Sequence, residues 1–391
     1  MLFSLAIIFL LGMILGSIFK KMHLPSLLGM LITGIVLGPY ALNILSPDLL
    51  AISGDLRKIA LIIILTRAGL NLDIQDLKKV GRPAILMCFI PALFEISGTM
   101  ILAPKLFHIS LIEAGILGTV IAAVSPAVIV PKMLKIMNEG YGIKKSIPQM
   151  ILAGASVDDI FVIVLFSIFI NLAKGVKISL LTLASIPISI VTGLATGFII
   201  GVLLYKFFQN YHIRDSAKVL IILSISFLLV TLEEHISSFI PFSGLLGIMT
   251  IGGTIQKYKS ELSQRLALKY SKLWVAAEIC LFVLVGATVN LNYAINAGTD
   301  ALFLLIFLLL FRIIGVLLCV AKTSLNNKEK IFTMISYTPK ATVQAAIGSI
   351  PLALGLACGD TVLTVAVLSI LITAPLGALA IDFSYKKLLS E

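Results

Sequence analysis

The sequence predicts an all-α polytopic membrane protein with thirteen transmembrane helices, arranged as two inverted six-helix repeats. Three observations lead to this fold class: the composition, the lengths of the apolar runs and the placement of the basic residues. Hydrophobic residues make up 59% of the 391 residues and charged residues only 13%, whereas soluble domains carry roughly 25% charged residues. Because so few charges do not cover the surface of a soluble protein, lipid must be the solvent for most of the chain.

Thirteen apolar runs are long enough to cross a bilayer, which takes about 20 helical residues. The first run has no basic residue before it and Lys20 and Lys21 after it. This charge order is the reverse of a signal peptide's, so we expect a retained helix. The predicted spans are 2–19, 25–44, 57–72, 82–103, 109–136, 147–173, 178–206, 215–232, 236–255, 273–292, 299–321, 329–355 and 360–384.

The basic residues set the orientation of these spans. With the N-terminus outside, 22 of the 30 Lys and Arg residues fall in inside loops and three fall within spans. Cytoplasmic loops carry the excess of Lys and Arg, so the N-terminus is predicted outside and the C-terminus in the cytoplasm, in a bacterial-type cell membrane. The net charge of +11 therefore reports topology and predicts no nucleic-acid partner. The five basic residues in outside loops are Arg57, Lys58, Lys105, Lys174 and Lys177.

Two similar segments, one in each half of the chain, indicate an internal repeat. Residues 65–72 read LTRAGLNL and residues 284–291 read LVGATVNL, at an offset of 219. We interpret the chain, 1–391, as a single membrane transporter domain with a first repeat at 2–173, a linker helix at 178–206 and a second repeat at 215–384. Such inverted repeats are common in secondary transporters.

Helix-breaking residues interrupt two spans at mid-depth. Ser125 precedes Pro126 in span five, and Thr338 precedes Pro339 in span twelve. Pro and Gly are common in membrane helices, but a matched pair of breaks favours two broken helices that cross at the midplane, where unwound backbone lines a wet cavity. Lys340 follows directly and is placed to compensate the negative helix ends.

Charged residues within spans are costly and mark function by default. Asp158 and Asp159 lie midway along an otherwise apolar span. A buried carboxylate without a partner tends to hold a proton, and a small hard cation with oxygen ligands can replace that proton. The alternative is a structural pairing with Arg or Lys, but two adjacent acids exceed the need of one salt bridge. The acids are therefore predicted to bind Na⁺ and H⁺ in competition.

The remaining in-span charges are predicted to compensate charge or to form structural ion pairs. Under the repeat offset, Arg67 corresponds to a position beside Glu278, and Glu95 to a position beside Arg312. Static pairs that hold helices together are the favoured interpretation over direct ion contact. This group comprises Lys340, Arg312, Glu95, Glu278 and Arg67.

Three motifs give the sequence a resemblance to a known family. AAVSPAVIVPKML (122–134), AGASVDDIF (153–161) and TPKATVQAAIG (338–348) resemble the monovalent cation:proton antiporter superfamily, and its NHA-type sodium/proton antiporter branch most of all. The resemblance covers nearly the whole chain. It implies sodium transport, pH homeostasis and a homodimer, with Asp159 as the principal ion and proton carboxylate and Asp158 beside it.

The resemblance also implies two functional parts. A mobile core, 82–173 and 299–384, would carry the ion elevator-fashion, and a dimerisation domain would comprise 2–72 and 215–292. Two departures stand out. Arg312 occupies a position where many two-aspartate relatives have Lys, and Val124-Ser125-Pro126 replaces the Thr-Asp-Pro of some relatives, so Ser125 or nearby carbonyls are expected to supply ligands.

The predicted function is a secondary-active antiporter that exchanges Na⁺ or Li⁺ for H⁺ without a cofactor. Within the same fold, a K⁺/H⁺ antiporter or a sodium-coupled organic-anion symporter is the alternative. An intramembrane aspartyl protease is disfavoured, because adjacent aspartates on one helix cannot face each other and Ala357-Cys358-Gly359-Asp360 lacks the first Gly of the usual motif. We therefore expect no enzyme activity. The sequence has no phosphate-binding loop that would indicate an ATP-driven pump.

Overall fold

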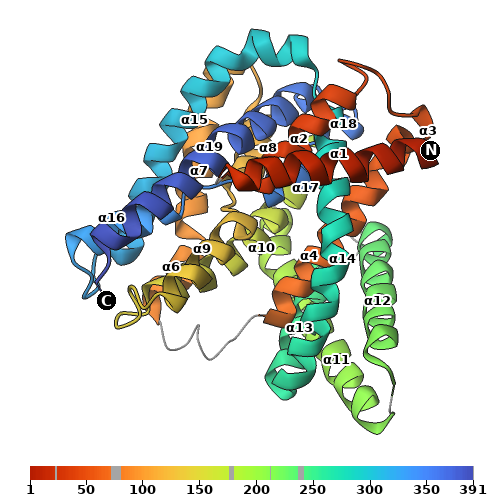
Figure 1. Cartoon of the computed structure of the whole chain (residues 1–391), viewed down its shortest axis with the longest axis vertical. Coiled ribbons are helices and arrows are strands. Elements are labelled where there is room, and N and C mark those ends of the chain that lie inside the picture. The colour runs from red at the N-terminus through yellow and green to blue at the C-terminus, as the bar shows by residue number, and fades with distance from the viewer. Residues whose placement is uncertain (23, 72–80, 176–179, 212, 237–241, 391) are drawn as a thin grey trace. The chain divides into compact units, whose positions relative to one another are not determined.

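The computed structural model describes residues 1–22, 24–71, 81–175, 180–211, 213–236 and 242–390 (Figure 1). Every regular element among these residues is a helix. Within the described ranges, nine helical stretches are long and apolar enough to cross a membrane, and Ser26–Leu37 and Thr342–Ala353 are shorter apolar stretches. The chain therefore has an all-helical polytopic membrane fold.

The chain divides into two compact units. Unit 1 comprises Met1–Gly54, Asp76–Lys174 and Ile279–Glu391, and unit 2 comprises Asp55–Gln75 and Gly175–Glu278. The helices of unit 2 are α4 (Ser53–Asn71, from Asp55 onward), α11 (Leu180–Asn210), α12 (Asp215–Ile236), α13 (Gly244–Tyr258) and α14 (Ser260–Ala287, up to Glu278).

Unit 1 holds the larger set of helices, in which α7 packs against α8 and α15, and α16 runs beside α19 (Figure 1). Its helices, besides the end of α14, are α1 (Leu2–Lys21), α2 (Ser26–Leu37), α3 (Pro47–Ala51), α6 (Arg82–Met87), α7 (Ile90–Phe107), α8 (Leu111–Ala122), α9 (Pro126–Asn138), α10 (Ile147–Ala173), α15 (Leu291–Val320), α16 (Asn327–Ser336), α17 (Thr342–Ile347), α18 (Ile350–Ala353) and α19 (Gly359–Leu388).

Helix ends differ from the predicted spans in places. The range of α10 coincides with the predicted span 147–173. The start predicted at 273 is wrong, because α14 begins at Ser260 and includes the basic residues Arg265, Lys269 and Lys272. Likewise α4 begins at Ser53, so Arg57 lies within a helix and is buried. A helix satisfies its own backbone hydrogen bonds in water as well as in lipid, so an apolar boundary does not end it.

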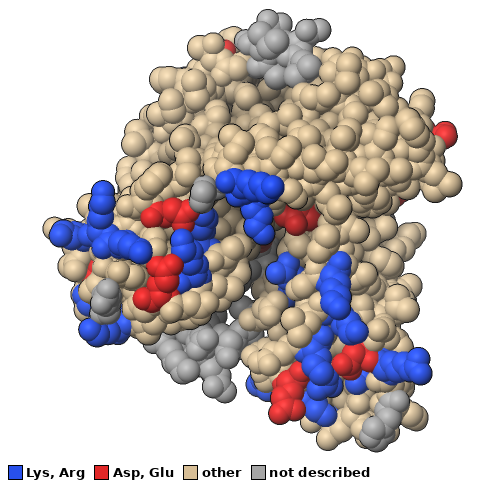
Figure 2. Space-filling model, in the orientation of Figure 1, with Lys and Arg blue, Asp and Glu red and all other residues tan. Residues whose placement is uncertain are grey.

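Two loops and the C-terminal segment of unit 1 meet at one end of the unit. Figure 2 shows charged side chains gathered over the end where α9, α16 and the C-terminus lie. Lys145 Nζ contacts Glu329 Oε2 at 2.8 Å, and the Tyr385 hydroxyl donates to Glu139 Oε2 at 2.6 Å. The Gly142 N–H donates to the Ser390 carbonyl at 2.8 Å. These contacts join the α9–α10 loop, the α15–α16 loop and the C-terminal residues.

Glycine allows α2 and the end of α14 to pack backbone against backbone. A Cβ built on Gly34 would lie 1.9 Å from the Val283 carbonyl oxygen, and one on Gly286 would lie 2.2 Å from the Leu31 carbonyl oxygen. Small residues permit this close approach in membrane helices, where packing drives association. The α2–α14 contact of unit 1 therefore depends on these two glycines.

We predict that Gly34→Ala destabilises the protein by about 1–3 kcal/mol, because the added methyl overpacks a backbone contact. Thermal unfolding of the purified protein in detergent measures the effect. Gly54→Ala is the matched control, because a Cβ there meets nothing within 4 Å. Equal melting temperatures for the two variants would contradict the packing argument.

Candidate ion-binding site

The first helix break separates α8 from α9. A capping box of Ser110 and Glu113 starts α8, which ends at Ala122. Ala123 and Ser125 have extended backbone, and α9 begins with Pro126 at its first position. Proline disfavours helix in the residue before it and has no N–H to donate, so it ends one helix and starts the next.

The second break separates α16 from α17 and lies against the first. Residues 337–341 form no helix, and the Pro339 carbonyl accepts a 2.8 Å hydrogen bond from the Ser125 N–H. The Lys340 N–H donates to Thr373 Oγ1 of α19 at 3.0 Å. A Cβ on Gly377 of α19 would lie 2.5 Å from Pro339 Cγ, so glycine makes room for the break.

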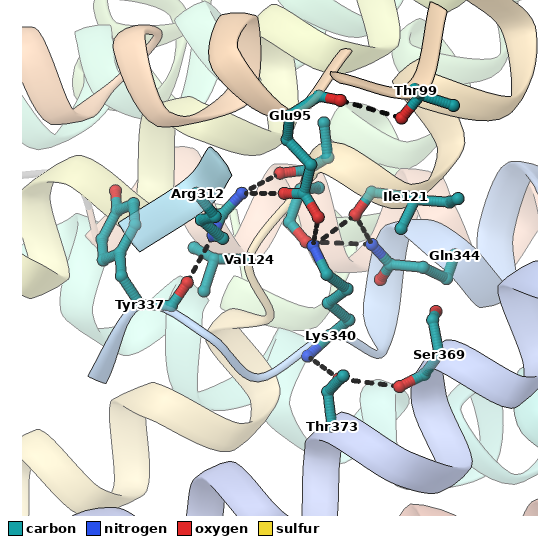
Figure 3. A network of polar contacts seen from close by, with 12 residues as sticks. Glu95, Thr99, Ile121, Val124, Arg312, Tyr337, Lys340, Gln344, Ser369 and Thr373 are labelled. Atoms are coloured by element: carbon teal, nitrogen blue, oxygen red, sulfur yellow. Dashed lines mark hydrogen bonds and ion pairs between the residues drawn. The ribbon is translucent and has the colours of Figure 1, made fainter. Parts of the chain in front are cut away.

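Arg312 of α15 joins the two breaks (Figure 3). Its guanidinium is fully buried and donates to the Tyr337 carbonyl at the second break and to the Ala122 carbonyl at the end of α8. It also contacts Glu95 Oε2 at 2.8 Å and Asp158 Oδ2 at 3.0 Å. One planar fork thus binds acceptors from four different elements, which a lysine ammonium cannot reproduce.

Lys340 occupies the other side of Glu95. Its ammonium lies 2.6 Å from Glu95 Oε1 and donates to the Ile121 carbonyl at 2.7 Å (Figure 3). The Gln344 carboxamide of α17 donates to the same carbonyl at 3.1 Å and to the Ala123 carbonyl at 2.9 Å. Side chains therefore satisfy the Ile121, Ala122 and Ala123 carbonyls at the end of α8, where helical partners are missing.

The two adjacent aspartates have different surroundings. Asp158 is fully buried, and its Oδ2 accepts from Arg312 and from the Val124 N–H at 2.9 Å. Asp159 is 8% exposed, and the Oδ1 atom of each aspartate is buried without a hydrogen-bond partner in the described part of the chain. The difference lies in Oδ2: Arg312 and the Val124 N–H hold that of Asp158 as a counter-ion, whereas among the described residues no hydrogen bond or ion pair holds Asp159.

The other predicted site residues lie in two places. Ser125 is fully buried, and its hydroxyl lies 3.4 Å from that of Thr342. Arg67 and Glu278 belong to unit 2, where both are half-buried and attract each other electrostatically. The structure therefore brings together Glu95, Ser125, Asp158, Asp159, Arg312 and Lys340 in unit 1 and leaves the Arg67–Glu278 pair in unit 2.

Two contributors escaped the sequence argument. Gln344 binds two carbonyls at the first break, and Tyr337 supplies an acceptor to Arg312. An amide in an otherwise apolar span was the available signal for Gln344, because polar groups inside a membrane need partners. The contribution of Tyr337 comes from its backbone, which side-chain chemistry does not reveal.

The polar groups at the two breaks are mostly oxygen atoms. Among the described residues no group of three or more His, Cys, Asp or Glu side chains is placed to hold a metal ion. Carboxylate, hydroxyl and carbonyl oxygens surround the two breaks, and such hard ligands suit hard cations.

Comparison with known proteins identifies the family. A family model described as "Sodium/hydrogen exchanger, transmembrane" matches residues 5–385. The chain belongs to the sodium/hydrogen exchanger family. It is therefore an integral membrane protein of the monovalent cation:proton antiporter superfamily.

Other family members are similar over their length. Sodium/hydrogen exchanger 9B2 of Homo sapiens is 34% identical, over 100% of this chain and 75% of the relative. Sodium/hydrogen exchanger 9B1 of Mus musculus is 30% identical, over 100% of this chain and 72% of the relative. The sodium proton antiporter MjNhaP1 from Methanocaldococcus jannaschii has the same fold, with a TM-score of 0.87 at 19% identity over 99% of this chain and 98% of that chain.

We predict that Arg312→Ala destabilises this family member by about 3–5 kcal/mol, because it leaves the buried Asp158 without its ion-pair partner and removes one of the two partners of Glu95. Arg312→Lys should destabilise the protein less than Arg312→Ala does, because it keeps the positive charge, but it should not match the native stability, since one ammonium cannot bind all four acceptors. Thermal unfolding in detergent measures both. Arg265→Ala is the control: the Arg265 side chain is 51% exposed and pairs with Asp215, so its loss should cost less than about 1 kcal/mol. Similar losses at both positions would argue against the central role of Arg312.

Proposed function

We propose that this chain is a secondary-active antiporter that exchanges Na⁺ or Li⁺ for H⁺, with Asp159 as the carboxylate that binds either ion. The family assignment and the sodium/hydrogen exchanger relatives support cation/proton antiport. The observation that carries the choice of Asp159 is that it is buried with no hydrogen bond or ion pair among the described residues, beside Asp158, whose Oδ2 is bound by Arg312 and the Val124 N–H.

Charge counting supports this role. The network contains two acids, Glu95 and Asp158, and two bases, Arg312 and Lys340, so its formal charges cancel. Asp159 is left as one additional negative charge, which a single proton or a single monovalent cation neutralises. An isolated charge in a low-dielectric interior is costly, so the site favours being occupied by one or the other.

Exchange follows from this competition. The proton and the cation cannot occupy Asp159 together, and only a neutralised site passes an apolar barrier at low cost. Loading with Na⁺ on one side and with H⁺ on the other couples the two fluxes. We propose that Ser125 and carbonyls near the first break add oxygen ligands, that Asp158 assists, and that no cofactor takes part.

The proposed mechanism is an elevator. The core, 82–173 and 299–384, would move against a dimerisation domain, 2–72 and 215–292, in a homodimer. Support comes from the site contacts described above, which all lie within the proposed core. The thirteen spans, the inverted repeats around 178–206 and the crossing of the two broken helices at Pro126 and Pro339 belong to the same proposal.

The proposed orientation places the N-terminus outside and the C-terminus in the cytoplasm. The α9–α10 loop, the α15–α16 loop and the C-terminal segment meet at one end of unit 1. All three carry Lys residues and are predicted to lie inside, as the positive-inside rule requires. A bacterial-type cell membrane stays a prediction from the sequence.

We predict that Asp159→Asn abolishes Na⁺-driven proton flux in proteoliposomes, because the amide cannot exchange a proton for a cation. The protein should still fold, since Asp159 pairs with no base in the described ranges. A pH-sensitive dye inside the vesicles reports the flux, and replacement of an exposed carboxylate of α15, Asp300→Asn, is the control. Full exchange by Asp159→Asn would rule out the assignment.

Competition at one carboxylate makes a second prediction. Lowering the pH should raise the apparent KM for Na⁺, while saturating Na⁺ should restore the maximal rate. Proton flux measured over a range of Na⁺ concentrations at several pH values, with the membrane potential clamped, checks this. A maximal rate that falls with pH at constant KM would indicate separate sites for the two ions.

A further inference from the structure

One peptide unit in the first break is held from both sides. The Ala123 carbonyl accepts from Gln344 Nε2 at 2.9 Å, and the Val124 N–H donates to Asp158 Oδ2 at 2.9 Å. These two groups belong to the same planar amide, and in a trans peptide they point in opposite directions. Gln344 and Asp158 therefore form hydrogen bonds with opposite edges of the Ala123–Val124 peptide, and rotation of this peptide would break both.

The orientation of this peptide decides what Asp158 faces. As observed, the carboxylate receives an N–H, which stabilises its charged form without any ion. With the peptide turned over, the Ala123 carbonyl would face the carboxylate, and two oxygens side by side favour a proton or a cation between them. The Gln344 carboxamide is fully buried, and its Oε1 has no partner in the described part of the chain, so its amide hydrogens alone fix its orientation.

We propose that Gln344 is a positioning residue of the ion site: it holds the Ala123–Val124 peptide with its N–H toward Asp158, which keeps Asp158 a fixed counter-ion and leaves Asp159 to carry the ion. This inference rests on the proposed antiport function. Gln344 acts through the backbone and touches neither aspartate in any hydrogen bond described here.

Other charged groups near Asp158 act from different directions. Lys340 shares the Ile121 carbonyl with Gln344, so the Ile121 carbonyl keeps a donor when Gln344 is replaced, whereas the Ala123 carbonyl loses its side-chain donor. The titratable or charged groups that act on Asp158 are Arg312 and Cys319 on α15, Lys340 and Tyr337 at the second break, Cys88 after α6, and Asp159 beside it; Glu95 reaches it through Arg312.

Gln344→Met tests the proposal, because it keeps the length of the side chain and removes the donor. Without the Gln344 donor, no side-chain donor in the described ranges holds the Ala123–Val124 peptide with its N–H on Asp158, so the site should bind protons more readily. We expect the apparent KM for Na⁺ at fixed pH to rise about threefold to tenfold, the range of one lost hydrogen bond. The pH of half-maximal exchange should move upward by about half to one unit, with a smaller change in kcat.

Ser369→Ala is the matched structural control. Ser369 is fully buried in α19 and donates only within its own helix, to the Ala366 carbonyl at 2.6 Å. It should lower thermal stability without moving the KM or the pH profile. If Gln344→Met behaves like Ser369→Ala, with stability lost and the pH profile unmoved, the positioning role is wrong.

A double-mutant cycle separates action through Asp158 from a general effect. Adding Gln344→Met to Asp158→Asn should shift the KM and the pH profile much less than it does in the native background. Full additivity would overturn the proposal. If Gln344→Met does not fold, Gln344→Leu also removes the donor without adding an ionisable group and should move the pH profile in the same direction; an unmoved profile in that variant would also overturn it.

The two proposals fail differently. Asp159→Asn in the same vesicles tests the antiport site, and residual exchange there would defeat the proposed function whatever Gln344 does. Loss of exchange in Asp159→Asn together with an unshifted Gln344→Met would defeat only the positioning role.

Discussion

The structure of unit 1 depends on how two broken helices satisfy their backbone without water. In a bilayer each unpaired N–H or carbonyl costs several kcal/mol, and a break frees several at once. Here each break supplies part of what the other lacks, because the Ser125 N–H donates to the Pro339 carbonyl. Arg312 completes the join by binding the Tyr337 and Ala122 carbonyls, one from each break.

That solution brings charge into the interior, and the charge then has to be balanced. Arg312 and Lys340 satisfy carbonyls only because Glu95 and Asp158 neutralise them. Buried ion pairs add little net stability but strongly penalise the loss of one partner, so the network tolerates a single arrangement. The backbone requirement thus leads to a network in which the two acids and the two bases balance each other's charge. Because this network needs no further charge, the neighbouring Asp159 is available to an ion.

What the sequence can indicate about this region follows from local chemistry. Pro126 and Pro339 mark helix ends, and an ionisable group in an apolar span is conspicuous. It does not predict the asymmetry of Asp158 and Asp159, since helical periodicity only turns adjacent residues by about 100° and partners 34 and 154 residues away make the difference. The start of α14 escaped prediction because hydropathy reports the lipid boundary, whereas hydrogen bonding decides where a helix ends.

The confinement of the network bears on how an ion crosses the membrane. In the described part of the chain, the partners of Asp158 and the side-chain donors to the carbonyls at the end of α8 come from α15, α17 and the segments at the two breaks, all of them within unit 1. A motion that opened the site by separating these elements would leave buried charges and backbone groups without partners, at a cost of several kcal/mol for each group. A motion that carries them together leaves every contact intact. These energetic costs support the proposed elevator mechanism, in which the site moves as one body.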